Sequence, residues 1–157
     1  MSAVAIRQAD ARDVPAMAAI RAEAWESAAY WERRLAKYLA REIGAREALP
    51  EHAMFVAEME GMTVGLVAGH RTTRHGCHGE LEWIHVAWAW RGSGIGGKLL
   101  GMMAGWFAER DALRVCVDVE PDNSEARAFY KKYGARDLKP SWMVWEDIRV
   151  VIDRKAG

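Results

Sequence analysis

A run of glycines between an apolar strand and an apolar helix constrains this chain more than any other feature. Residues 91–98 read Arg-Gly-Ser-Gly-Ile-Gly-Gly-Lys. The glycines disfavour a helix there, since each costs about 0.8–1 kcal/mol relative to alanine. Glu80–Val86 before the run is typical of a strand, and Leu99–Phe107 after it is apolar at helical spacing. A strand, a glycine-rich turn and a helix point backbone N–H groups at the helix start, which predicts a phosphate-binding loop.

Several interpretations of this loop compete. The glycines match the dinucleotide-binding pattern, with Asp118 at about the expected ~20-residue spacing, but that fold opens with the motif and here it begins at residue 92. Residues 92–98 also spell most of a nucleotide-hydrolase loop, but Leu99 stands where a serine or threonine would bind magnesium. A turn that binds no ligand stays open on the loop alone.

A second pattern downstream favours another ligand. Arg91, Gly94 and Gly96 form an Arg-x-x-Gly-x-Gly pattern, and residues 123–134 read Asn-x-x-Ala-x-x-x-Tyr-x-x-x-Gly. The two patterns, in this order, resemble the acyl-CoA-dependent N-acetyltransferases of the GNAT superfamily. The resemblance covers about residues 52–149 and is looser before them. Asp122 is the expected N-cap of the second segment's helix, with Glu125 three residues on.

The resemblance implies a fold and an activity. The expected fold is a single domain over residues 1–157, of mixed α/β class, with a central mixed, mostly antiparallel sheet flanked by helices. The expected activity is transfer of an acetyl group from acetyl-CoA to a primary amine of a small molecule or peptide. A non-catalytic acyl-CoA-binding module and a nucleotide-binding protein are the alternatives.

The resemblance also assigns roles to residues. Tyr130 would protonate the departing thiolate, since a phenol with a pKa near ~10 keeps its proton at neutral pH. The general base is open between Glu80, Glu82, His85 and an ordered water, and Glu80 and Glu82 are expected on one strand face. The residues expected to hold acetyl-CoA are Ile84, His85, Val86, Arg91, Gly92, Ser93, Gly94, Ile95, Gly96, Gly97, Asn123 and Tyr130. One departure is Trp88, which stands where the family often has proline.

Composition limits the classes of partner and the cellular setting that are expected for this chain. Twenty-two basic and 22 acidic residues give a net charge of zero, which argues against nucleic acid as a partner. No apolar stretch is long enough for a membrane span, and the N-terminus lacks a signal-peptide pattern. Two cysteines are too few for a disulfide framework, which favours a cytoplasmic setting. A minority of the eight tryptophans are candidates for a substrate pocket or a homodimer interface.

Local patterns predict the remaining elements. Ala28–Ile43 is an expected helix, and 52–59 with 62–70 an expected hairpin. His75, Cys77 and His78 lie close together, but their spacing matches no common zinc site, so no metal is expected. A last strand at 141–146 is expected to end the fold, followed by a frayed polar tail over 153–157.

Overall fold

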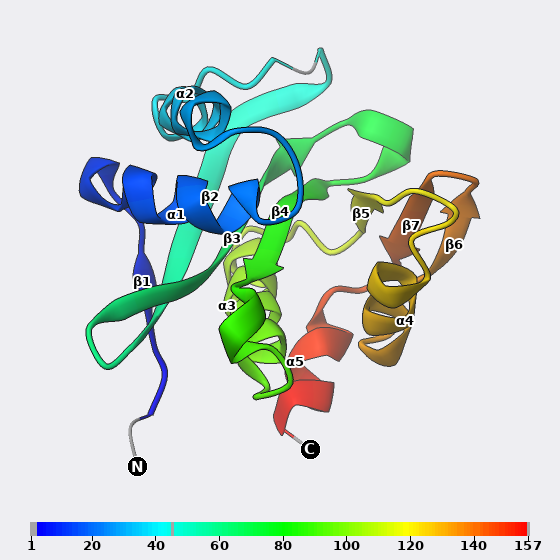
Figure 1. Cartoon of the computed structure of the whole chain (residues 1–157). Coiled ribbons are helices and arrows are strands. Elements are labelled where there is room, and N and C mark those ends of the chain that lie inside the picture. The colour runs from blue at the N-terminus through cyan, green and yellow to red at the C-terminus, as the bar shows by residue number, and fades with distance from the viewer. Residues whose placement is uncertain (1–2, 45, 157) are drawn as a thin grey trace.

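The computed structural model describes residues 3–44 and 46–156, which form one seven-stranded sheet with helices on both faces (Figure 1). The strand order is β1-β2-β3-β4-β5-β7-β6, and every neighbouring pair is antiparallel except β4 with β5. This confirms the predicted fold class. The strands are β1 (Ala5–Gln8), β2 (Ala48–Met59), β3 (Met62–Thr72), β4 (Gly79–Val86), β5 (Val115–Asp118), β6 (Arg136–Lys139) and β7 (Trp142–Trp145).

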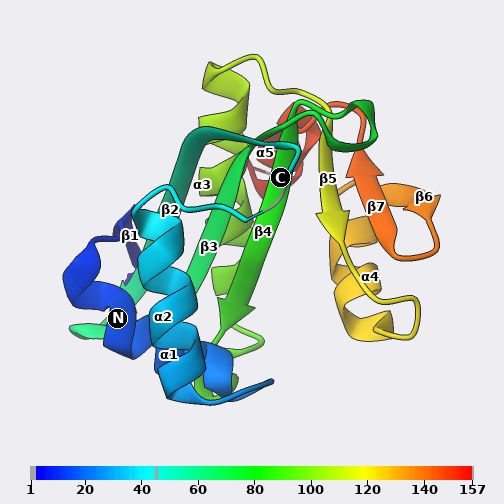
Figure 2. The same ribbon diagram turned by 90° about the horizontal axis from the view of Figure 1, so that it is seen from above.

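Five α-helices cover the sheet in the described residues. Their bounds are α1 (Val14–Ala22), α2 (Ala28–Leu39), α3 (Ile95–Glu109), α4 (Ser124–Lys132) and α5 (Arg149–Ala156). Helices α1 and α2 lie on one face of the sheet, and α3 and α5 lie on the other (Figure 2). None of these helices is long and apolar enough to cross a membrane.

Each face has its own apolar core. Met17 and Leu35 pack with Trp83 of β4 under α1 and α2, while Leu99 and Phe107 of α3 pack against the opposite face. A side chain at Gly97 would collide with the hydroxyl of Tyr133, the C-cap residue of α4, so the lack of one lets α3 and the end of α4 approach closely. The two cores hold β3 and β4 between them, and these strands carry most of the candidate site.

Strand β4 leaves β5 part-way along its length. The parallel pairing covers only Gly79–Leu81 opposite Val115–Val117, while the antiparallel pairing with β3 continues to Val86. The ribbons of β4 and β5 separate beyond that point (Figure 2). One side of the second half of β4 is therefore without a strand partner in the described part of the chain.

Several boundaries differ from those expected. Asn123, not Asp122, is the N-cap of α4, because its Oδ1 accepts the Ala126 N–H at 3.1 Å. Helix α2 ends at Leu39 rather than at residue 43. The expected tail is instead helix α5, which runs to Ala156, and Gly157 lies outside the described residues. Strand β6 was not predicted, because its four mainly charged residues lack an apolar alternation.

Candidate active site

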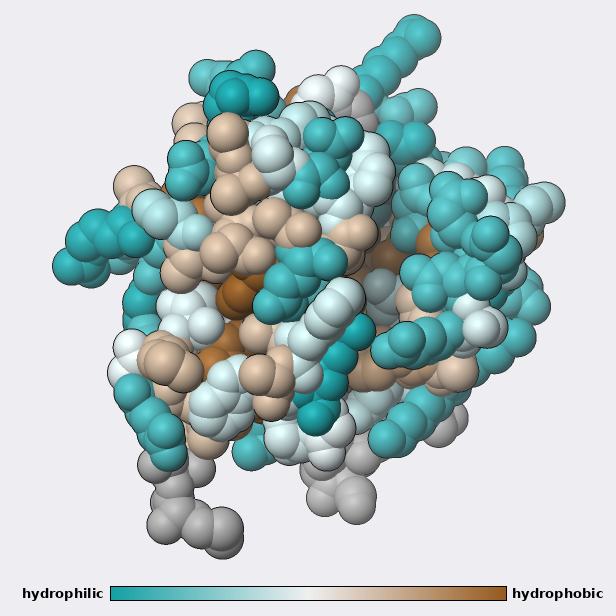
Figure 3. All heavy atoms as spheres, viewed as in Figure 1, coloured by the Kyte–Doolittle hydropathy of each residue, from teal (hydrophilic) through white to brown (hydrophobic). Residues whose placement is uncertain are grey.

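The separation of β4 from β5 opens a hollow in the surface. The space-filling view shows this recess between the part of the molecule around β4 and the part around α4 (Figure 3). The Ala87 N–H donates to Val64 on the β3 side. Because successive N–H groups on a strand alternate in direction, the Val86 N–H is aimed at the opening. An extended ligand could pair there with the free side of β4, as an added strand would.

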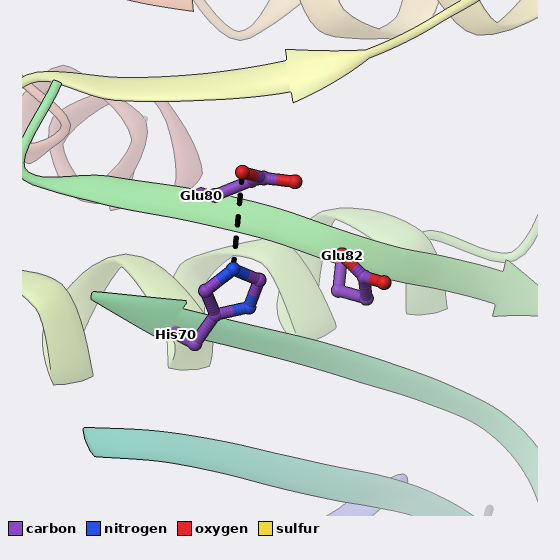
Figure 4. Close-up of side chains that lie close together, drawn as sticks. All are labelled: His70, Glu80 and Glu82. Atoms are coloured by element: carbon purple, nitrogen blue, oxygen red, sulfur yellow. Dashed lines mark ion pairs between the residues drawn. The ribbon is translucent and has the colours of Figure 1, made fainter. Parts of the chain in front are cut away.

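Two carboxylates and a histidine meet beside this opening. Glu80 and Glu82 come from β4 and His70 from β3, and their candidate ligand atoms lie within 4.8 Å of one another (Figure 4). The prediction that the two glutamates lie on one face of the strand is thus confirmed. The cause is not the simple two-residue alternation of a regular strand. Ala68 pairs with Trp83 and Gly69 with Leu81, so Glu82 is the extra residue of a β-bulge.

The cluster is buried and its pKa values are strongly perturbed. Burial, and next the charge of Glu82, raises the pKa of Glu80 to about 7, against the opposing effect of Arg74. Burial also raises the pKa of Glu82 and lowers that of His70 to about 4. Glu80 therefore titrates near neutral pH, the range in which a general base works best.

Neighbouring groups fix the cluster's charge and orientation. His70 Nδ1 and the Tyr38 hydroxyl share a 2.8 Å hydrogen bond, while His70 Nε2 lies 3.8 Å from Glu80 and has no hydrogen-bond partner in the described structure. Arg74 donates to Glu80 at 3.0 Å, and Arg34 lies 3.8 Å from Glu82. The three side chains could in principle bind a metal ion, but two adjacent guanidinium groups oppose a cation there.

Tyr130 of α4 is buried, and its ring lies edge-on to the ring of Trp145, with the two centroids 5.6 Å apart. Burial raises the pKa of its phenol above the usual value, and the charge of Arg21 acts in the opposite direction. The phenol therefore stays protonated at neutral pH.

The glycine-rich loop has the backbone of an anion-binding turn. Gly92 and Gly94 have φ of +81° and +84°, and Gly94 is the N-cap of α3 with no side-chain cap bond. A side chain at either position would meet nothing within 4 Å, so the space over the loop is open. The first N–H groups of α3 thus have room for a phosphate. Ile95 is 3% exposed, so only its backbone faces that space.

Arg91 and His85 lie at the inner edge of this loop. Arg91 Nε donates to the Val86 carbonyl at 3.0 Å, and its Nη2 lies 3.1 Å from His85 Nε2. Burial, and then the charges of Arg21 and Arg91, lowers the pKa of His85 to about 4. A histidine near two positively charged arginines is a weak base, so the glutamates are the better candidates for the general base. Trp88, in place of the family's proline, is 60% exposed in a 3-10 turn, with the Arg91 guanidinium 5.8 Å from its ring centroid.

The structure also brings in residues that sequence reasoning missed. His70 belongs to the cluster, and Tyr38 and Arg74 contact it, although all three lie far from both motifs in sequence. His70 sits in an otherwise apolar run of β3, and a lone histidine there was the one available signal. Asn123 is less available than expected, because its Oδ1 already caps α4.

Comparison with known proteins agrees with the resemblance. The model of the acetyltransferase (GNAT) family matches residues 14–135. The chain belongs to this family. It is 28% identical over 142 residues to a probable N-acetyltransferase of Mycobacterium tuberculosis (strain ATCC 25618 / H37Rv), covering 83% of this chain and 79% of that protein. The GNAT chain described here is accordingly an acetyltransferase.

Solved structures share the fold. Ard1 from Thermoplasma volcanium superposes with a TM-score of 0.74 at 22% identity, covering 91% of this chain and 96% of that one. The PaiA N-acetyltransferase from Thermoplasma acidophilum, in complex with coenzyme A, gives a TM-score of 0.69 at 15% identity, with 92% and 99% covered. At these identities the likeness concerns the GNAT fold alone.

Proposed function

We propose that this enzyme transfers the acetyl group of acetyl-CoA directly to a primary amine of a small molecule or peptide. The observation that carries the proposal is the opening between β4 and β5. The glycine-rich loop lies at one end of it, and the carboxylate cluster lies along the same strand. Helix α4, which carries Tyr130, lies on the other side of the hollow (Figure 3). This arrangement supports a route for acetyl-CoA from the loop to the cluster.

The donor would bind along β4. Backbone N–H groups of residues 91–97 would hold the pyrophosphate, helped by the dipole of α3. The amides of the pantetheine arm would pair with the free side of Ile84–Val86, which places the thioester deeper in the opening. The N–H of Val86 would then donate to the thioester oxygen, where such a donor stabilises the transition state by about 2.7–4 kcal/mol.

The chemistry needs one base and one acid. Glu80, with its pKa of about 7, would take a proton from the acceptor ammonium or from the attacking amine. The amine nitrogen then bonds to the thioester carbon, the carbon–sulfur bond breaks, and Tyr130 gives its proton to the sulfur of coenzyme A. Glu82 would tune Glu80 by its charge and take no proton from substrate.

Measurements of acetyl-CoA binding and of turnover test this proposal. Isothermal titration calorimetry should detect low-micromolar binding of acetyl-CoA and much weaker binding of NAD or ATP. Release of free thiol is then measured over a panel of polyamines, amino acids, aminoglycosides and peptides. Tight binding of ATP or NAD without binding of coenzyme A would overturn the proposal. Tight coenzyme A binding without turnover on any amine would favour the non-catalytic alternative.

The pH profile identifies the base. Removing the charge of Glu82 removes a group that raises the pKa of Glu80, so Glu82→Gln should move the rise of kcat/KM to lower pH. The acceptor amine titrates identically in both enzymes, and a shift between them therefore reports an enzyme group. Glu80→Gln should lose this inflection, and Glu32→Gln on the exposed side of α2 should leave it unchanged. An unmoved inflection in Glu82→Gln would assign it to another group.

A further inference from the structure

One cation beside the site lacks a counter-ion. The side chain of Arg21, at the end of α1, makes no hydrogen bond or ion pair with any described residue, and its Nε is buried. Its guanidinium stacks on the Trp31 ring at 4.3 Å from the centroid. This contact holds the group in place and leaves its N–H donors unused.

The other arginines around the opening are paired. Arg34 lies 3.8 Å from Glu82, Arg74 lies 3.0 Å from Glu80, and Arg91 lies 3.7 Å from Glu125. Each of these three guanidinium groups has a carboxylate within 4 Å, whereas Arg21 has no such partner among the described residues. Burial lowers the pKa of Arg21 only to about 10, so it is charged at neutral pH. Arg21 is half-buried with its Nε enclosed, so an anion placed against its guanidinium would be screened less by water than at an open surface.

The position of Arg21 decides which molecule supplies the anion. The Trp31 ring on which it stacks lies 5.6 Å from the ring of Trp83 on β4, the residue after Glu82. Glu23, two residues after Arg21, lies 3.8 Å from His85. Arg21 therefore lies beside the second half of β4, at the acetyl-transfer end of the opening. The thioester end of acetyl-CoA carries no charge, and its phosphates would lie at the glycine-rich loop on the start of α3. The anion must therefore come from the acceptor.

We infer that Arg21 binds a carboxylate of the acceptor, so that the substrate is an amino acid or a similar small amine with a carboxylate near its reactive nitrogen. This inference rests on the proposed function and names its substrate class. The carboxylate would lie against the guanidinium as a charge-assisted, two-pronged pair, which fixes the orientation of the neighbouring amine toward Glu80.

Matched acceptors test the inference. Each proteinogenic L-amino acid is compared with its carboxamide, which keeps the amine and side chain but loses the charge. The rates are divided by the fraction of free amine. The wild type should favour the carboxylate form of at least one pair by about 10–100-fold in kcat/KM, the usual contribution of a hydrogen bond to a charged group. Arg21→Gln should remove this preference, and Arg21→Lys should keep part of it.

A control and a second readout separate the outcomes. Arg33→Gln, on the exposed side of α2, should keep the full preference. Calorimetry with amino acids in the presence of coenzyme A, which needs no turnover, should show binding that is lost in Arg21→Gln. Equal use and equal binding of carboxylate and carboxamide in every pair would overturn the inference. An equal loss of kcat/KM for the carboxylate and carboxamide forms in Arg21→Gln would also overturn the inference. Acetylation of carboxamides or polyamines in that case would leave the proposed function standing.

Discussion

Tyr130→Phe is expected to lower the single-turnover rate of acetyl transfer by about 10²–10⁴-fold, the usual contribution of a general acid. The change removes one hydroxyl and keeps the ring that packs edge-on against Trp145. Thermal stability and acetyl-CoA affinity should therefore change little. Single-turnover measurement is needed because slow product release would hide part of the loss.

A control variant at a second tyrosine and a donor with a different leaving group make this test specific to Tyr130. Tyr133→Phe removes a hydroxyl from the C-cap residue of α4, next to Gly97, and should leave the rate near that of the wild type. A thioester donor with a more acidic thiol should partly restore Tyr130→Phe, since that thiolate needs less protonation. A wild-type rate in Tyr130→Phe would reduce Tyr130 to a packing residue.

Gly94→Val is expected to weaken acetyl-CoA binding by roughly 100-fold or more. A β-branched residue at φ +84° is strained, so the turn must shift. The shift would disturb the N–H groups at the start of α3, each of which contributes about 1.5–3 kcal/mol to a charged ligand. The new side chain would also occupy the open space over the loop. Calorimetry with acetyl-CoA measures the loss.

The same change elsewhere in α3 provides the control. Gly105 has ordinary helical geometry and open space around it, so Gly105→Val should keep both fold and affinity. Circular dichroism should show that Gly94→Val remains folded, because an added Cβ there would meet nothing within 4 Å and would disturb no core packing. Unchanged affinity in Gly94→Val would mean that the loop is only a turn.

Local patterns in the sequence determined the loop, the elements on either side of it and the second motif. Four glycines before an apolar helical run favour a strand–turn–helix unit by backbone preference alone, and the observed φ values of Gly92 and Gly94 agree. The GNAT family assignment depends on these two patterns, and the family model confirmed it. Short-range errors remained where two residues compete for one role, as Asp122 and Asn123 do for the cap of α4.

Only the tertiary structure decided how the carboxylate cluster is assembled. The bulge at Glu82 depends on pairing with β3, and the meeting of His70 with Glu80 depends on that same pairing. The raised pKa of Glu80 follows from burial, which no local pattern reports. Arg21 belongs to neither sequence motif, and no local pattern marks it. It became the unpaired cation of the site because α1 and α2 fold over β4, and the counter-ions of the other arginines come from distant parts of the chain.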